Sequence, residues 1–163
     1  MPHHPDTIFI IRHAERPPDS TPPDPHLTDK GRARAAALVG YPFPALATIF
    51  AAKNSPKSAR PVETITPIAN ARGLVPSADI EDGDFLLLVP QVLSRAFKDK
   101  NMLICWHHEK IPRLARALGA IGPQPDPWPD GEFDRVWVLT YSVDGTVTFD
   151  NRPQNLLPGD STK

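Results

Sequence analysis

Runs of consecutive apolar residues alternate along this chain with longer segments in which apolar residues recur at helical spacing. Residues 8–11, 48–51 and 102–106 are almost entirely apolar, which is typical of strands that are covered on both faces. Residues 136–141 and 146–149 flank a Ser-Val-Asp-Gly segment, the pattern of a β-hairpin. The pattern therefore predicts five strands, of which the last two are antiparallel.

Helical segments are predicted between these strands, at residues 29–39, 59–71, 85–98 and 112–118. Thr28 and Ser58 precede the first two segments, where their hydroxyl oxygens can cap a helix N-terminus. Pro67 predicts a kink or an early break in the second helix, and Pro90 weakens the prediction of the third. Strands that alternate with helices indicate a three-layer α/β fold: a mostly parallel sheet flanked by helices, with an antiparallel hairpin at its C-terminal edge.

The chain of 163 residues has the size of one domain, and we expect a single domain over residues 1–163. Its net charge of −1 argues against nucleic acid or an anionic membrane as a partner. The only cysteine, Cys105, excludes an intramolecular disulfide, and no apolar stretch is long enough for a signal peptide or a membrane span. We expect a cytoplasmic protein.

Arginine and histidine residues, which can bind or attack a phosphoryl group, directly follow two of the predicted strands. Arg12 and His13 come after residues 8–11, and His107 and His108 come after residues 102–106. Open α/β sheets bind their ligands at the carboxyl ends of the strands. A guanidinium group can hold two phosphoryl oxygens while an imidazole nitrogen attacks phosphorus. The two strand ends therefore predict a site for a phosphorylated ligand.

Four segments resemble, in the same order, motifs of the histidine phosphatase superfamily, which includes phosphoglycerate mutases and acid phosphatases. Residues 12–18, Arg-His-Ala-Glu-Arg-Pro-Pro, are similar to the opening signature Arg-His-Gly-x-Arg-x-Pro, with Ala14 in place of the glycine. Residues 27–31 resemble the Leu-Thr-x-x-Gly helix entry, and residues 58–64 resemble the segment that supplies a second phosphate-binding arginine. Residues 103–111 resemble the strand end that carries a second histidine.

The resemblance implies a role for each matching residue. His13 is the implied nucleophile, which becomes a phosphohistidine, and Arg12, Arg16 and Arg60 are implied to surround the phosphoryl oxygens. Three arginines, which stay protonated, suit a phosphate monoester because most of the catalytic task is to hold and stabilise negative charge.

The second histidine has two alternatives. An ungapped alignment gives the role to His107, whereas some small members read Cys-Trp-Glu-His at this strand end, which gives it to His108. We favour His108 because the residues before it then match this local pattern as a whole. Either residue would donate to the phosphate in its imidazolium form.

A proton donor for the leaving alkoxide is also required. The acidic group Glu81, Asp82 and Asp84 lies where mutase-like members place theirs, and Glu109 directly follows the second histidine, as in acid-phosphatase-like members.

We therefore expect a phosphomonoester hydrolase that acts on a small phosphorylated metabolite or a phosphoprotein, releases inorganic phosphate, and uses no metal or organic cofactor. Adjacent histidine side chains on an extended segment point to opposite faces, so 107–109 is a poor metal site. One alternative is a phospho-ligand binding module that has lost turnover, which Ala14 and the unassigned acid leave open. A phosphoglycerate-type mutase is a further alternative, although little chain is left for the insertions of longer mutases.

Overall fold

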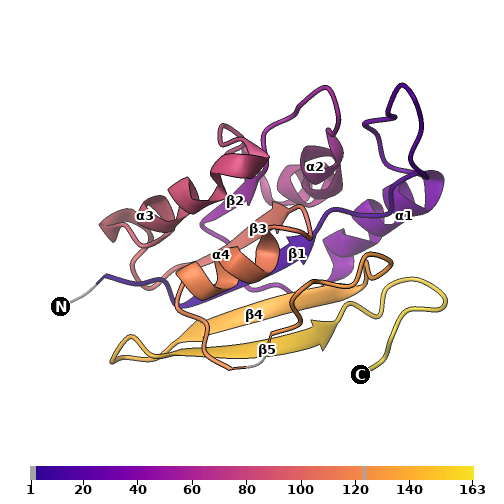
Figure 1. Cartoon of the computed structure of the whole chain (residues 1–163). Coiled ribbons are helices and arrows are strands. Elements are labelled where there is room, and N and C mark those ends of the chain that lie inside the picture. The colour runs from indigo at the N-terminus through magenta and orange to yellow at the C-terminus, as the bar shows by residue number, and fades with distance from the viewer. Residues whose placement is uncertain (1–2, 123) are drawn as a thin grey trace.

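A single five-stranded sheet forms the centre of the computed structural model, which describes residues 3–122 and 124–163. The strands are β1 (Thr7–Arg12), β2 (Thr48–Ala51), β3 (Asn101–Trp106), β4 (Arg135–Tyr141) and β5 (Val147–Pro153), in the order β2-β3-β1-β4-β5 (Figure 1). Strands β1, β2 and β3 are parallel, and β4 runs against both β1 and β5. The predicted mostly parallel sheet with an antiparallel C-terminal hairpin is confirmed.

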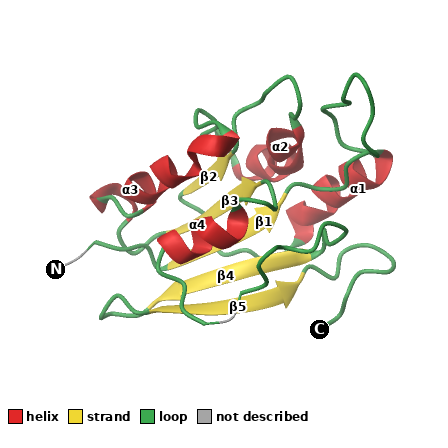
Figure 2. Ribbon diagram, in the orientation of Figure 1, coloured by secondary structure: helices red, strands yellow, loops and turns green. Residues whose placement is uncertain are grey.

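Helices cover both faces of this sheet, as the uniformly apolar strands predict (Figure 2). Ile8 and Ile10 of β1 pack into one buried cluster with α3 (Leu88–Val92) and α4 (Ile111–Ala117). Phe9 and Ile11 point to the opposite face and pack into a second cluster with α2 (Arg60–Arg72). Helix α1 (Asp29–Ala37) packs against α2. Because successive side chains of a strand alternate between faces, a three-layer fold requires apolar residues at every central position of β1, residues 8–11.

The first, second and fourth helices form close to where they are predicted. Thr28 caps α1 by accepting a hydrogen bond from the Gly31 N–H at 3.0 Å, and the last residues of the predicted segment form a 3-10 turn. Helix α2 begins one residue after its predicted start, and the Ser58 Oγ accepts the Arg60 N–H at 3.3 Å. The predicted early break at Pro67 is wrong, because burial of Ile65 and other residues against the sheet offsets one missing hydrogen bond.

The predicted helix over residues 85–98 is also wrong as one continuous element. The segment forms a 3-10 helix (Asp82–Leu87), the short α3 and a second 3-10 turn (Arg95–Phe97). Pro90 lies in the first turn of α3, where its missing N–H has no helical partner to lose. Its ring would crowd the carbonyl four residues earlier, which disfavours an α-helix that extends back through Leu86.

Sheet register brings three chain segments to one edge. Arg12 pairs with Trp106, Ala51 pairs with Cys105, and the His13 N–H donates to the Trp106 carbonyl at 3.1 Å. The segments that follow β1, β2 and β3 therefore leave the sheet side by side. Strand β4 is antiparallel to β1, so the loop that enters β4 reaches the same edge.

Candidate active site

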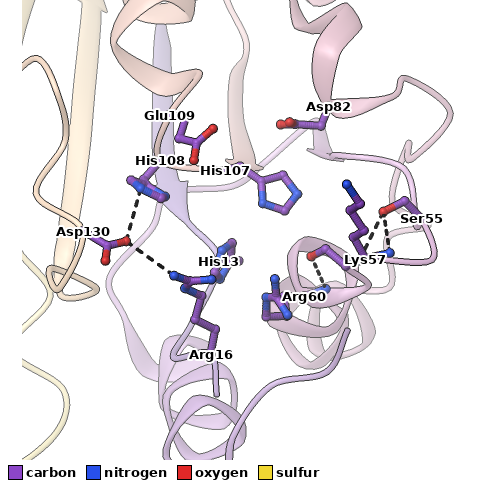
Figure 3. Close-up of a pocket in the computed structure, with 11 residues that line it drawn as sticks. His13, Arg16, Ser55, Lys57, Arg60, Asp82, His107, His108, Glu109 and Asp130 are labelled. Carbon is purple, nitrogen blue, oxygen red and sulfur yellow. Dashed lines mark hydrogen bonds and ion pairs between the residues drawn. The ribbon is translucent and has the colours of Figure 1, made fainter. Parts of the chain in front are cut away.

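A polar cavity of about 280 Å³ opens at this edge of the sheet (Figure 3). Seven of the residues predicted for the site line it: His13, Arg16, Arg60, Asp82, His107, His108 and Glu109. The other lining residues are Ser55, Lys57, Ser58 and Asp130. Segments that are almost a hundred residues apart in sequence thus contribute to one pocket, because parallel strands end together.

His13 is held in a single orientation at the end of β1. Its side chain is buried, and Nδ1 lies 2.7 Å from the Ala14 carbonyl oxygen. Since a carbonyl oxygen only accepts, Nδ1 carries the proton and Nε2 keeps its lone pair. Burial lowers the pKa of His13 well below its usual value, with the nearby His107, Arg12 and Arg60 acting in the same direction. A neutral imidazole with a free Nε2 has the protonation state of a nucleophile.

The two adjacent histidines after β3 have different neighbours. The ring centroid of His107 lies 5.2 Å from that of His13, in an edge-to-face arrangement. His108 turns toward Asp130, with its Nε2 at 3.4 Å from the Asp130 Oδ1. Burial and the positive charge of Arg60 lower the pKa of His107 to about 4, so this ring is neutral until an anion binds beside it. His107, and not the favoured His108, is the residue that contacts the His13 ring.

Arg60 and Arg16 supply positive charge from two further segments. Arg60 is the first residue of α2, is 8% exposed, and donates through Nη1 to the Asp24 carbonyl at 2.8 Å. Arg16 pairs with Asp19 at 2.9 Å. Burial lowers the pKa of Arg60, and the charge of Arg16 adds to this effect. Two guanidinium groups that repel each other across a cavity attract an anion between them.

Arg12 lies behind the cavity and does not line it. Its Nη1 donates to backbone carbonyls of the loop before β4, those of Pro129, Asp130 and Glu132. Its guanidinium carbon lies 3.9 Å from the centre of the Phe133 ring. Burial lowers the pKa of Arg12 to about 10, which leaves the side chain charged at neutral pH. Arg12 therefore fastens the 129–133 loop to the end of β1.

Unpartnered polar atoms gather around the cavity. Among the residues that the structure describes, the buried side-chain atoms without a hydrogen-bond partner are Nε and Nη2 of Arg12, Nε of Arg60 and Oδ1 of Asp82. Buried polar groups in folded proteins are nearly always paired, so unpaired ones call for an explanation. Three of these four atoms are cationic donors. An oxyanion bound in the cavity would give such donors an acceptor.

Asp82 is the acidic residue that the 81–84 group contributes to the cavity, whereas Asp84 is exposed and does not line it. Burial raises the pKa of the Asp82 carboxyl, and the nearby Glu109 adds to this shift. The Trp106 Nε1 donates to the Asp82 backbone carbonyl at 3.2 Å, which ties this segment to the end of β3. Asp82 and Glu109 both remain candidates for a proton donor on geometry.

Asp130 is the acidic lining residue that sequence reasoning missed. It belongs to the loop between α4 and β4, and no motif precedes it. One signal was available: an antiparallel β4 beside β1 must begin at the edge where β1 ends. Without knowledge of strand order, that signal could not select a residue.

In the described residues, no cluster of His, Cys, Asp and Glu side chains has an arrangement suited to a metal ion, and no helix has the length and apolarity to cross a bilayer.

The chain matches no protein-family model and no curated protein sequence. Solved structures similar to it include protein histidine phosphatase SixA complexed with tungstate, which is 18% identical with a TM-score of 0.57, covering 91% of this chain and 97% of that one. A mycobacterial glucosyl-3-phosphoglycerate phosphatase with inorganic phosphate is 13% identical with a TM-score of 0.59, and the match covers 92% of this chain and 97% of that one. Phosphoglycerate mutase from Plasmodium falciparum is 15% identical with a TM-score of 0.56, covering 96% of both chains. The chain therefore has the α/β fold that histidine phosphatases share with phosphoglycerate mutases.

Proposed function

We propose that this protein is a phosphomonoester hydrolase that works through a phosphohistidine at His13. The observation that carries the proposal is the Nδ1 contact of His13 with the Ala14 carbonyl at 2.7 Å, which leaves a neutral ring with its Nε2 lone pair free at an arginine-lined cavity. Bound tungstate and inorganic phosphate in two proteins of the same fold support an anion site of this kind.

The reaction proceeds in two displacements at phosphorus. The His13 Nε2 attacks the phosphorus of the ester, the P–O bond to the leaving group breaks, and the leaving oxygen takes a proton from an acid. Water then attacks the phosphorus of the phosphohistidine and the P–N bond breaks. The conjugate base of the acid takes a proton from the water, so that inorganic phosphate and free His13 result. Arg16 and Arg60, which line the cavity, hold the phosphoryl oxygens. Arg12, behind the cavity, is a further donor through its Nη2, which has no hydrogen-bond partner and lies 3.5 Å from the Asp130 Oδ1.

We assign the second histidine to His107 and the proton donor to Asp82. His107 contacts the His13 ring and becomes protonated when a dianion binds between it and Arg60, so that its ring donates to the phosphate. Burial raises the pKa of Asp82, which is the direction that favours a general acid. Glu109 remains the alternative donor, because it lines the same cavity.

The substrate class is a small phosphorylated metabolite or a phosphoprotein, and the location is the cytoplasm. The arginines supply the charge neutralisation that a divalent cation provides in other phosphoryl-transfer sites, so the reaction is proposed to need no metal.

Hydrolysis of p-nitrophenyl phosphate and of a panel of phosphorylated metabolites, with and without EDTA, tests the proposal. The wild-type protein should release phosphate in both conditions, and the His13→Ala variant should not. The His107→Ala variant should lose most activity while His108→Ala keeps more of it, since only His107 contacts His13. Phosphate binding by the wild-type protein without any turnover would instead favour a phospho-ligand binding module.

A further inference from the structure

The Asp130 carboxylate lies against two of the arginines that are proposed to hold the phosphate, and against His108. Its Oδ1 is 3.8 Å from the Arg16 Nη2 and 3.4 Å from the His108 Nε2 (Figure 3). The same oxygen is 3.5 Å from the Arg12 Nη2. One carboxylate oxygen thus faces three nitrogen atoms from two strand ends. An oxygen of a bound phosphate would need the two arginine nitrogens of this set.

The position of Asp130 is fixed by its backbone, although its side chain is 71% exposed. Arg12 holds the carbonyls of residues 129, 130 and 132 through one nitrogen atom. Trp128 is buried beside Trp137 with 4.8 Å between ring centroids, and its Nε1 donates to the Glu132 carbonyl at 2.8 Å. These anchors hold the loop on both sides of Asp130, so the backbone fixes the position from which its carboxylate reaches the cavity.

We propose that Asp130 is an internal anion that competes with phosphate for the arginines and so weakens phosphate binding. The inference rests on the proposed phosphate site. When phosphate enters, the Asp130 carboxylate either gives up its contacts with Arg12 and Arg16 or stays beside a second negative charge. Both outcomes cost free energy, because ion pairs are lost or like charges are brought together. A hydrolase with such a residue releases its product more readily.

A purely positioning role for Asp130 predicts the opposite sign. If the carboxylate served mainly to hold Arg12 and Arg16 in place for the phosphate, its removal would disorder the arginines and weaken phosphate binding. The direction of the change therefore separates competition from positioning.

Titration calorimetry with inorganic phosphate, on the full chain at low ionic strength, tests the proposal. Asp130→Asn should bind phosphate about 3- to 30-fold more tightly than the wild type, as expected for loss of two or three partly exposed charge contacts. Asp130→Glu, which keeps the charge, should remain close to the wild type. The difference between Asn and wild type should shrink as salt is added, because these groups are partly exposed.

Asp126→Asn is the matched control. It removes the same charge from the same loop, but its partner is Arg116 at 2.8 Å, outside the cavity. This variant should bind phosphate as the wild type does, and thermal unfolding of each variant checks that it is folded. Equal or weaker phosphate binding by folded Asp130→Asn would overturn the proposal. Absence of phosphate binding in every protein, wild type included, would instead overturn the phosphate site itself.

Discussion

Replacing Gly31 by alanine would push a methyl group into the backbone that follows the nucleophile. A Cβ at Gly31 would lie 2.5 Å from the Glu15 carbonyl oxygen and 3.1 Å from the Glu15 nitrogen. An ordinary contact begins near 3.4 Å, so the Glu15 oxygen would have to retreat by about 0.9 Å (3.4 − 2.5). The same oxygen accepts the Thr28 N–H at 3.0 Å, and this hydrogen bond joins the start of α1 to the 12–18 segment.

Two opposing terms set the change in the free energy of unfolding. Alanine in place of glycine inside a helix contributes about 1 kcal/mol of stability, whereas the overpacked contact costs about 1–3 kcal/mol. The net destabilisation is then at most about 2 kcal/mol, or roughly 4–8 °C in Tm for a domain of this size. Turnover should suffer more, because Glu15 is two residues from His13 and a displacement near 1 Å at a reacting group costs about 100-fold.

Steady-state hydrolysis of p-nitrophenyl phosphate and thermal unfolding measure the two effects on one sample. Gly31→Ala should remain folded at 25 °C and lose about 10- to 100-fold in kcat/KM. Gly40→Ala is the matched control, since a Cβ there meets no atom within 4 Å, and it should keep full activity. Wild-type activity in Gly31→Ala would refute the proposed coupling between helix α1 and the nucleophile.

Three other residues give separate tests of the site and its supports. Asp82→Asn should slow hydrolysis of alkyl phosphates far more than that of p-nitrophenyl phosphate, whose leaving group needs no proton; equal effects on both substrates would exclude Asp82 as the acid. Asp160→Asn should lower the free energy of unfolding at pH 7 by about 3 kcal/mol, because it removes the buried charge that pairs with Arg34 at 2.8 Å. Urea unfolding measures this loss. A change below about 0.5 kcal/mol, the usual effect of a surface substitution, would contradict it. The pKa of His107 is about 4 in the folded protein and the ordinary 6.5 in the unfolded chain, so the unfolded chain binds the proton more readily. Protonation of His107 therefore lowers the free energy of unfolding as the pH falls from 6.5 to 4, by up to about 3 kcal/mol. Unfolding at pH 7 and pH 4.5 should therefore show a smaller acid loss for His107→Gln than for the wild type, and identical losses would count against this pKa.

The strands could be predicted because each buried face leaves a local pattern. β1 and β3 are apolar at every central position since helices cover both faces, and the hairpin is set by a short turn. The segment 85–98 shows the limit of this reasoning. Phe85, Leu88 and Val92 are buried as helical spacing predicts, yet Pro90 divides the segment. Periodicity reports which side chains are buried, and it does not report where backbone hydrogen bonds stop.

Site residues could be predicted where their order along the chain determines their position in the fold. They could not be predicted where the position depends on the register between strands. His13 and Arg60 follow or begin elements, so their arrival at one edge follows from parallel strands. His107 and His108 point in different directions, and the pairing of Arg12 with Trp106 selects His107 as the neighbour of His13. Asp130 depends on strand order, on the Arg12 contacts and on a buried Trp128, none of which appears as a local pattern.

Covalent labelling of His13 is the most direct measurement of the mechanism. Rapid acid-free quenching of the protein during turnover of p-nitrophenyl phosphate, followed by peptide mass spectrometry under alkaline conditions, should find an acid-labile phosphoryl group on His13. The same peptide from His13→Ala should carry none. Sustained hydrolysis by His13→Ala, or phosphate found only on another residue of the wild type, would contradict a phosphohistidine at this position.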